Sequence, residues 1–390
     1  MERIILHIDV NSAFLSWSAL KLIEEGNKKD IRNEISVIAG NPAKRHGIII
    51  AASVPAKKIG IKPPINLYEA RKIYKDLIVI KPDMYYYKKR SEELIMYLKK
   101  LFKEVQQYSI DECFVDYTSY KKIYGDEVKF AYKLKDEIYK KFHFTVNIGI
   151  GNNKLSAKMA SDFDKPNKVH TLYEHEFKEK VWNLDISELF MAGKSACKTL
   201  RELNINKIGE LANADVNMLI RHLKSHGKLL WEYANNIDNS QVDIGGYSDR
   251  KGIGFSRTLE YDMTDKDELF KYLFDFSSWI SKSLRNKKIY AYSVTVTIRN
   301  DEFKTYNHGH KYLNGVNSVS DIYDIATRLF NEVWNKEPVR LIGLRVTDFS
   351  ESNNYQLSLF EEKVDDVKMN EVVDKINNKF GKNVIKKGIK

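Results

Sequence analysis

The fold is decided by the stretch YSIDECFV, residues 108–115, in which two adjacent acids, Asp111 and Glu112, stand inside an apolar strand pattern. A third acid, Asp9, follows the apolar run IILHI at residues 4–8. Both stretches predict short buried strands whose carboxylates emerge where the apolar pattern stops. Neighbouring strands that bring carboxylates to one point make an oxygen-rich site suited to Mg²⁺, and paired ions of this kind serve phosphoryl transfer. The alternative interpretation is that these acids are solvated caps or turn residues, which is the commoner case for isolated acids at strand ends.

The composition indicates a folded protein of several domains with a polyanionic partner. The 390 residues are 43% apolar, which is enough to bury a sizeable core, and their formal net charge is +11. A basic chain that also carries acid clusters favours nucleic acid over membrane as the partner, with binding that weakens in salt. A surplus of surface charge that serves solubility alone is the competing interpretation.

Cysteine usage and hydropathy exclude several classes of protein. Only Cys113 and Cys197 are present, so neither a disulfide framework nor a Cys-rich zinc site is expected, and both cysteines are interpreted as packing residues. The N-terminal apolar run has only five residues before Asp9, too few for a signal peptide or a membrane span. A cytoplasmic protein is therefore expected.

Residues 1–170 alternate between strand-like and helix-like patterns, which predicts an α+β layer of antiparallel strands with helices on one side. Strands are expected at residues 4–9, 35–39, 48–52, 77–80 and 144–150, and in a hairpin around Asp111. Helices are expected at residues 13–25, 56–59, 67–73, 84–102 and 128–142.

From about residue 171 to residue 240 the pattern becomes helical with short loops. Helices are expected at residues 185–189, 194–203, 208–211 and 216–233. Gly193 and Lys194 open one of them, and exposed amides at a helix N-terminus can hold a backbone phosphate. Because Gly-Lys is common at helix starts, this signal is weak by itself.

The C-terminal part predicts a second α+β unit after a linker. Residues 241–251 include Gly245 and Gly246, are charged and have little apolar content, which is typical of a linker. In residues 252–350, strands are expected at 254–259, 290–299, 303–306 and 339–349, with helices at 267–284 and 320–334.

A basic surface is expected on this second unit. Strand 290–299 alternates apolar and polar residues, so its polar face could lie along a nucleic-acid backbone, and Arg285, Lys287 and Lys288 cluster nearby in sequence. A solvated basic surface without a ligand is the alternative. Beyond residue 350 the chain is polar, except for QLSLF at residues 356–360 and an amphipathic stretch at residues 364–380.

Three motifs together resemble one family over roughly residues 1–360. They are HIDVNSAF at residues 7–14, SIDE at residues 109–112, and GIGNNKL at residues 149–155 followed by AK at 157–158 and KPN at 165–167. In this order and spacing they resemble the Y-family translesion DNA polymerases of the DNA polymerase IV and UmuC type.

The resemblance implies a right-hand polymerase, an α+β multidomain fold. Its palm would comprise residues 1–20 and 80–170, its small fingers 21–79, and its helical thumb, with a helix-hairpin-helix, 171–240. Residues 241–251 would be the linker, 252–350 an α+β little finger, and 351–390 a tail. Such an enzyme adds deoxynucleotides to a primer 3′-OH with low fidelity and releases pyrophosphate. No acid set for a proofreading exonuclease is apparent.

The same resemblance implies roles for the acids. Asp9 and Asp111 would bridge two Mg²⁺ ions, for which Mn²⁺ can substitute. Glu112 would serve the primer-side ion, and the backbone carbonyl of Val10 would serve the triphosphate-side ion. Because consecutive strand residues point to opposite faces, Asp111 and Glu112 can both reach the ions only if the chain bends there.

The nucleotide site follows from the first and third motifs. Phe14 occupies the steric-gate position, where a ring beneath the sugar excludes a 2′-OH, although read alone it predicts a core aromatic. The amides of Ser12 and Ala13 would cradle phosphates, and Lys165 would contact the triphosphate.

The fingers depart from the family pattern. Many relatives carry Tyr-x-Ala-Arg, whereas here the sequence is VPAK at residues 54–57. Lys57 would still supply a positive charge, but without the bidentate fork of arginine, and the tyrosine hydroxyl is missing. This departure puts the affinity for the nucleotide in doubt more than the reaction.

The remaining contacts would be to DNA and to a sliding clamp. Primer-template DNA would touch Gly193 and Lys194 in the thumb and Arg285, Lys287 and Lys288 in the little finger, mostly at phosphates. The tail segment closely matches the pentapeptide that binds the clamp (beta subunit), with apolar anchors for a preformed groove; its residues are Gln356, Leu357, Ser358, Leu359 and Phe360. No membrane partner and a monomeric state are expected.

Two other functions remain open at this point. A two-metal nuclease would also use clustered carboxylates and basic surfaces, but it would not need Phe14 at the sugar. A catalytically inactive repair factor could occupy DNA and the clamp, but the presence of all three carboxylates argues against it.

Overall fold

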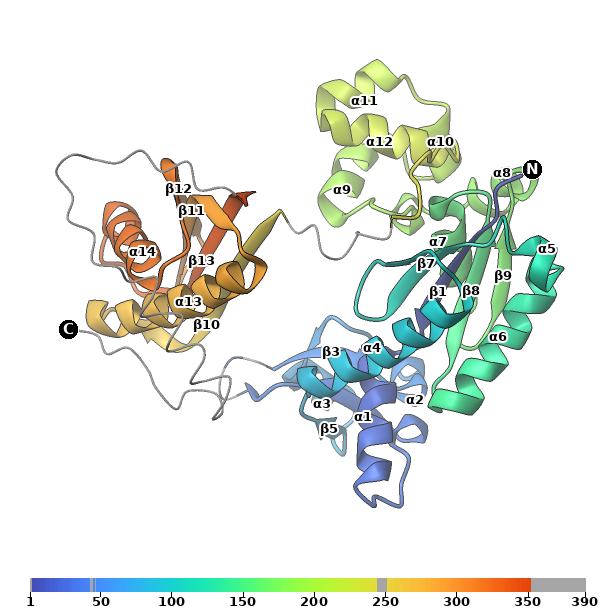
Figure 1. The fold of residues 1–390 in the computed structure, drawn as a ribbon, viewed down its shortest axis with the longest axis horizontal. Coiled ribbons are helices and arrows are strands. Elements are labelled where there is room, and N and C mark those ends of the chain that lie inside the picture. Colours follow the sequence, from blue (N-terminus) through green and yellow to red (C-terminus); the bar gives the residue numbers. More distant parts are fainter. Residues whose placement is uncertain (1, 43–44, 46, 244–250, 352–390) are drawn as a thin grey trace. The chain divides into compact units, whose positions relative to one another are not determined.

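The computed structural model describes residues 2–42, 45, 47–243 and 251–351. These residues divide into two compact units, one of residues 2–40 and 47–243 and the other of residues 41, 42, 45 and 251–351 (Figure 1). Residues 244–250 of the expected linker, the segment 356–360 and the stretch 364–380 lie outside the described residues.

The first unit is built on a five-stranded sheet of order β6-β7-β1-β8-β9 (Figure 1). The central strand β1 is antiparallel to both of its neighbours, while β8 and β9 are parallel. The strands are β1 (Ile5–Val10), β6 (Val105–Gln107), β7 (Glu112–Asp116), β8 (Val146–Gly151) and β9 (Val169–Leu172). The helices that accompany them are α4 (Met84–Leu101), α5 (Lys121–Tyr124), α6 (Glu127–Phe142) and α7 (Lys154–Asp162).

The alternation along β1 separates a core face from a functional face. Leu6, Ile8 and Val10 are buried in the core formed with α4 and α6. Ile5 points the other way, into a small cluster with Ala157 of α7. Because side chains alternate along a strand, His7 and Asp9 share the face of Ile5 and lie on the α7 side of the sheet.

A smaller mixed sheet follows the first helix. Its order is β4-β3-β2-β5, in which only β2 and β5 run parallel. The elements are α1 (Ala13–Glu24), a 3₁₀ turn at Ile31–Asn33, β2 (Ser36–Ala39), β3 (Ile48–Ala52), α2 (Val54–Lys58), β4 (Ile65–Asn66), α3 (Leu67–Ile73) and β5 (Ile78–Ile80). The side chain of Ser53 accepts a hydrogen bond from the Ala56 amide and so begins α2, the helix that carries Lys57.

A group of short helices completes the first unit. They are α8 (Glu174–Val181), a 3₁₀ turn at Ile186–Glu188, α9 (Lys194–Glu202), α10 (Ile208–Ala212), α11 (Val216–Leu223) and α12 (Ser225–Ala234). The single helix expected over residues 216–233 is wrong. Lys224, with φ 57° and ψ −141°, leaves the helical region and separates α11 from α12.

The second unit is an antiparallel sheet of order β10-β13-β11-β12 packed on two long helices. Its elements are β10 (Gly252–Met263), α13 (Lys266–Lys287), β11 (Tyr290–Asn300), β12 (Thr305–Val316), α14 (Val319–Val333) and β13 (Val339–Ser350). The expected alternation in β11 is confirmed, because Val294, Val296 and Ile298 are buried. Strand β12 is longer than expected and starts at Thr305, after a turn in which Phe303 has φ 63°.

The α+β class predicted for the chain is therefore confirmed. Both cysteines are free and buried, which agrees with their interpretation as packing residues. Within the described ranges, no helix is long and apolar enough to cross a bilayer.

Candidate active site

One cavity of about 880 Å³ in the first unit gathers all the residues predicted for the metal and nucleotide sites. It lies where the end of β1 meets α1, α2 and the loop after α7. The predicted residues that line it are Asp9, Val10, Ser12, Ala13, Phe14, Lys57, Asp111, Glu112 and Lys165. Residues more than 150 positions apart in the sequence are therefore brought to a single hollow.

The carboxylates are placed by strand register. Asp9 on β1 lies directly opposite Glu112 on β7, so both side chains leave the same face of the sheet. Asp111 precedes β7 in a bend, where its carbonyl accepts a hydrogen bond of 3.1 Å from the Val10 amide. Ser109 Oγ donates to the Asp111 carboxylate at 2.6 Å. The predicted bend between Asp111 and Glu112 is present, because Asp111 stands outside the ladder.

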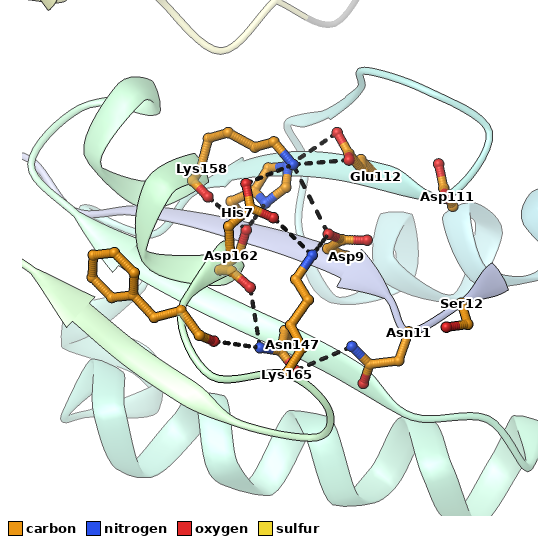
Figure 2. Close-up of polar contacts among 12 residues, drawn as sticks. His7, Asp9, Asn11, Ser12, Asp111, Glu112, Asn147, Lys158, Asp162 and Lys165 are labelled. Atoms are coloured by element: carbon orange, nitrogen blue, oxygen red, sulfur yellow. Dashed lines mark hydrogen bonds and ion pairs between the residues drawn. The ribbon is translucent and has the colours of Figure 1, made fainter. Parts of the chain in front are cut away.

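Two lysines neutralise the paired carboxylates (Figure 2). Lys158 Nζ on α7 lies 2.9 Å from Glu112 Oε1 and 3.9 Å from Asp9 Oδ2. Lys165 Nζ forms an ion pair with Asp9 and lies 2.7 Å from Asp162 Oδ1. Lys158 also lies 3.4 Å from Asp162 Oδ2, so Asp162 is shared by both ammonium groups.

Burial and these charges set the protonation of the carboxylates. Burial raises the pKa of Asp9 and of Asp111. Burial would also raise the pKa of Glu112, but His7 and Lys158 beside it lower that pKa to about 2. The pKa of Lys165 is raised, because its attraction to Asp9 and Asp162 outweighs the effect of burial. Both Glu112 and the lysine therefore carry their charges at neutral pH.

The donor set fits a hard divalent cation. Asp9, Glu112 and Asp111 offer carboxylate oxygens to one cavity, and the lysine ammonium groups already stand beside two of them as cations. In the part of the chain that the structure describes, no group of three His, Cys, Asp or Glu side chains is assembled to hold a metal ion. The oxygens are therefore of the kind that hard divalent cations prefer, and two of the three carboxylates are now paired with lysines.

Phe14 is held by a stacked aromatic partner. Its ring lies 4.9 Å from that of Tyr87 on α4, with 15° between the ring planes. Tyr87 is fully buried, and its hydroxyl lies 2.6 Å from Ser18 Oγ. Phe14 therefore lines the cavity with one surface and packs on the core with the other.

Ser12 and Lys57 meet on the fingers side of the cavity. Ser12 precedes α1 in the left-handed region, with φ 46°. Lys57 Nζ donates a hydrogen bond of 2.8 Å to Ser12 Oγ. Burial lowers the pKa of Lys57, and the charge of nearby Lys165 adds to this effect.

The other predicted contacts lie outside this cavity. Gly193 immediately precedes α9 and Lys194 is its first residue, with an exposed side chain. Arg285 and Lys287 are in the last turn of α13, and Lys288 ends that helix with φ 54°. The segment 356–360 falls beyond the described residues.

Sequence reasoning missed His7, Lys158 and Asp162. His7 is fully buried; its Nδ1 lies 2.7 Å from Ser161 Oγ and its Nε2 lies 3.6 Å from Glu112 Oε2. For Lys158 and Asp162 the available signal was helical spacing, since the two residues stand four positions apart on one helix.

Comparison with known proteins places these motifs in a family. The impB/mucB/samB family matches residues 8–162, and the C-terminal domain of the same family matches residues 250–359. A DNA polymerase IV of Clostridium acetobutylicum is 44% identical over 395 residues, which cover 100% of this chain and 98% of the relative. A DNA polymerase IV of Oceanobacillus iheyensis is 33% identical over 391 residues, covering 98% and 91%.

A solved structure supports the fold. A Y-family DNA polymerase chimera of Dbh and Dpo4 superposes with a TM-score of 0.76 at 24% identity, covering 88% of this chain and 98% of that chain. The likeness extends over both units, and the sequence relatives cover the chain from end to end. The chain therefore belongs to the impB/mucB/samB family, and within it to the Y-family DNA polymerases of the DNA polymerase IV type.

Proposed function

We propose that this protein is a translesion DNA polymerase that extends a primer by one deoxynucleotide at a time on a DNA template. Family membership supports a DNA-directed DNA polymerase with DNA and nucleotides as substrates. The observation that carries the proposal at this site is the single cavity that joins three carboxylates, two lysines and the Phe14 ring. Neither the nuclease nor the inactive factor is favoured by the relatives.

The roles of the residues follow from their positions in the cavity. Asp9, Asp111, Glu112 and the Val10 carbonyl would hold two Mg²⁺ ions, with Mn²⁺ as a substitute. Bound metal would supply charge neutralisation and a lowered pKa of the primer hydroxyl. Around it, Lys57 and Lys165 would bind phosphate oxygens, while the amides of Ser12 and Ala13 would orient the triphosphate.

Phe14 would select the sugar. Its ring stacks on buried Tyr87 and cannot retreat into the core, so a sugar placed over it meets a fixed surface. A 2′-OH directed at that surface would lose its hydration and find no partner. Deoxynucleotides would therefore be preferred.

The domains and partners belong to the same proposal. Residues 1–20 and 80–170 would be the palm, 21–79 the fingers, 171–240 the thumb and 252–350 the little finger. Gly193, Lys194, Arg285, Lys287 and Lys288 would contact phosphates. A monomeric, cytoplasmic enzyme that binds a sliding clamp through residues 356–360 is proposed, without proofreading.

Primer extension with Mg²⁺ on an undamaged and an abasic template tests the function. Wild type should lengthen the primer on both templates, whereas Asp111→Ala should bind DNA normally and retain no more than a few per cent of the extension. A shortened primer would instead indicate a nuclease, and binding without any change in length would indicate a recruitment factor. Asp116→Ala, which changes an acid outside the cavity lining at the far end of β7, is the matched control.

The clamp contact needs a separate experiment. Replacing Leu359 and Phe360 by alanine should leave extension by the isolated enzyme unchanged, because the role proposed for both residues is to bind the clamp and neither is proposed to bind metal, nucleotide or DNA. The same variant should lose the gain in product length that loaded clamp gives to wild type. Equal stimulation of both proteins would contradict the proposed clamp segment.

A further inference from the structure

The catalytic carboxylates are already engaged by internal cations. Lys158 lies 2.9 Å from Glu112, its side chain is only 10% exposed, and that of Glu112 is 18% exposed. Lys165 pairs with Asp9, whose side chain is 8% exposed. Buried carboxylates without a counter-charge would be costly, so these pairs stabilise the site.

The same pairs oppose metal binding. A divalent ion at Asp9 and Glu112 must take oxygens that the ammonium groups now contact, and the positive charges repel one another at short range. Lys158 cannot simply move into solvent, because α7 packs directly on the sheet and buries it. A third acceptor for the ammonium groups is therefore needed next to the carboxylates.

Asp162 has the geometry of that acceptor. It lies 2.7 Å from Lys165 and 3.4 Å from Lys158, while its side chain is 50% exposed and free of the strand register that fixes the two carboxylates. Each lysine already contacts Asp162 and a catalytic carboxylate together. Each lysine can therefore release its catalytic carboxylate by losing one contact, without adopting a new rotamer.

We propose that Lys158 and Lys165 hold Asp9 and Glu112 while no metal is bound, and that Asp162 retains both ammonium groups when metal enters. Asp162 is then a positioning residue that makes the free energy of metal binding more favourable. Lys158 is a competitor that makes it less favourable. By linkage, if the lysine contacts weaken metal binding, then bound metal weakens the lysine contacts by the same free energy. This inference rests on the proposed metal role of Asp9 and Glu112.

Opposite substitutions should shift metal affinity in opposite directions. We would titrate full-length enzyme with Mn²⁺, without DNA or nucleotide, and follow free Mn²⁺ by electron paramagnetic resonance. Lys158→Gln should tighten Mn²⁺ binding about fivefold or more, and Asp162→Asn should weaken it by a similar factor, as expected for coupling between neighbouring charges. Asp162→Glu, which keeps the carboxylate, should restore binding close to that of wild type.

The neighbouring pair Asp164 and Lys168 supplies charge-matched controls. Their side chains lie 3.8 Å apart and are 74% and 53% exposed. Asp164→Asn and Lys168→Gln, in the segment that follows α7, change the net charge by the same amounts and should leave the Mn²⁺ affinity unchanged. The proposal would be overturned if Asp164→Asn weakened Mn²⁺ binding as much as Asp162→Asn does, or if Lys158→Gln bound Mn²⁺ more weakly than wild type.

Two further measurements separate the possible failures. Asp9→Asn should abolish the Mn²⁺ site; if it does not, the proposed metal ligands are wrong. If it does, and Lys158→Gln and Asp162→Asn bind like wild type, only the present inference fails.

Should Lys158→Gln not fold, Lys165→Gln carries the same prediction, because this lysine is 35% exposed. For either lysine variant, Mn²⁺ should raise the melting temperature more than it does for wild type.

Discussion

Glu112 is a residue whose ionisation the site favours strongly. Its pKa is lowered from 4.5 to about 2, so the folded protein favours the carboxylate more than the unfolded chain does. The resulting stabilisation is fully present above pH 4.5 and is lost as the pH falls towards 2. Glu112→Gln removes the group that titrates.

Urea unfolding in EDTA at pH 6 and pH 3 measures this effect. Wild type should exceed Glu112→Gln in free energy of unfolding at pH 6, and the difference should shrink at pH 3, where Glu112 in the unfolded chain is protonated. A difference that stays constant between the two pH values would show that Glu112 stabilises through packing alone. Asp116→Asn, which removes a carboxylate at the other end of the same strand, is the control.

Phe14 carries the second prediction at the residue scale. Phe14→Ala opens space beneath the sugar, so the ratio of kcat/KM for ribonucleotides to that for deoxynucleotides should rise at least about tenfold. Single-nucleotide insertion kinetics with both substrates measure the ratio. Tyr87→Phe, which keeps the ring stacked on Phe14 but removes the hydroxyl bonded to Ser18, should preserve discrimination. Unchanged discrimination in Phe14→Ala would place the sugar gate elsewhere.

At the residue scale, the sequence predicts groups that have a local pattern and misses groups that depend on distant partners. Asp9 and Glu112 are recognisable because each interrupts an apolar strand. Lys158 occupies an ordinary position on a helix, and its partners are 46 and 149 positions away in the chain. Apart from its place in the AK pair of the third motif, nothing local distinguishes it from a surface lysine until the sheet and α7 are packed together.

At the element scale, the contact between α7 and β8 sets the position of Lys158. A Cβ added at Gly149 would lie 2.0 Å from the Ala157 carbonyl oxygen and 2.3 Å from the Ser161 amide nitrogen. Only the absence of a side chain lets the helix approach the strand this closely. The helix and its lysine are therefore held by backbone contact with the sheet.

Gly149→Ala tests this contact. The added methyl must push α7 from the sheet, so the free energy of unfolding should fall by about 2 kcal/mol or more. Gly193→Ala is the comparison, because its added Cβ would meet no atom within 4 Å, and its cost should be clearly smaller. Denaturant unfolding of both variants measures the difference. Equal stability losses would contradict a close helix–strand contact at Gly149.

The elements themselves were largely predictable. Strand and helix bounds in residues 1–170 agree with the sequence pattern within two residues wherever an element was expected, as for β3 and α3. The break at Lys224 was not predictable, since lysine rarely has a positive φ and the apolar spacing continues across this residue. Tertiary packing supplies the reason: a Cβ at Gly227 would lie 2.4 Å from the Leu219 carbonyl oxygen, so α11 and α12 turn tightly onto each other.

At the scale of the whole molecule, charge governs the encounter with DNA. The chain carries a formal charge of +11, although the cavity proposed to be catalytic is lined by Asp9, Asp111 and Glu112. Binding to phosphates releases condensed cations, so the affinity for primer-template DNA should fall steeply with salt. Each lysine that contacts a phosphate contributes about 0.9 to the slope of log K against log salt.

Helix α13 offers a matched test of this prediction, because it carries lysines at both ends. Lys287 and Lys288 belong to the proposed DNA surface, whereas Lys266 and Lys271 lie near the start of the helix and are exposed. Replacing Lys287 and Lys288 by glutamine should reduce the salt slope by about 2, and replacing Lys266 and Lys271 should leave it nearly unchanged. Fluorescence anisotropy with labelled primer-template at several salt concentrations measures both slopes. If the two double variants lose equal slope, the basic cluster at the end of α13 acts through net charge alone, and the proposed phosphate contacts there are wrong.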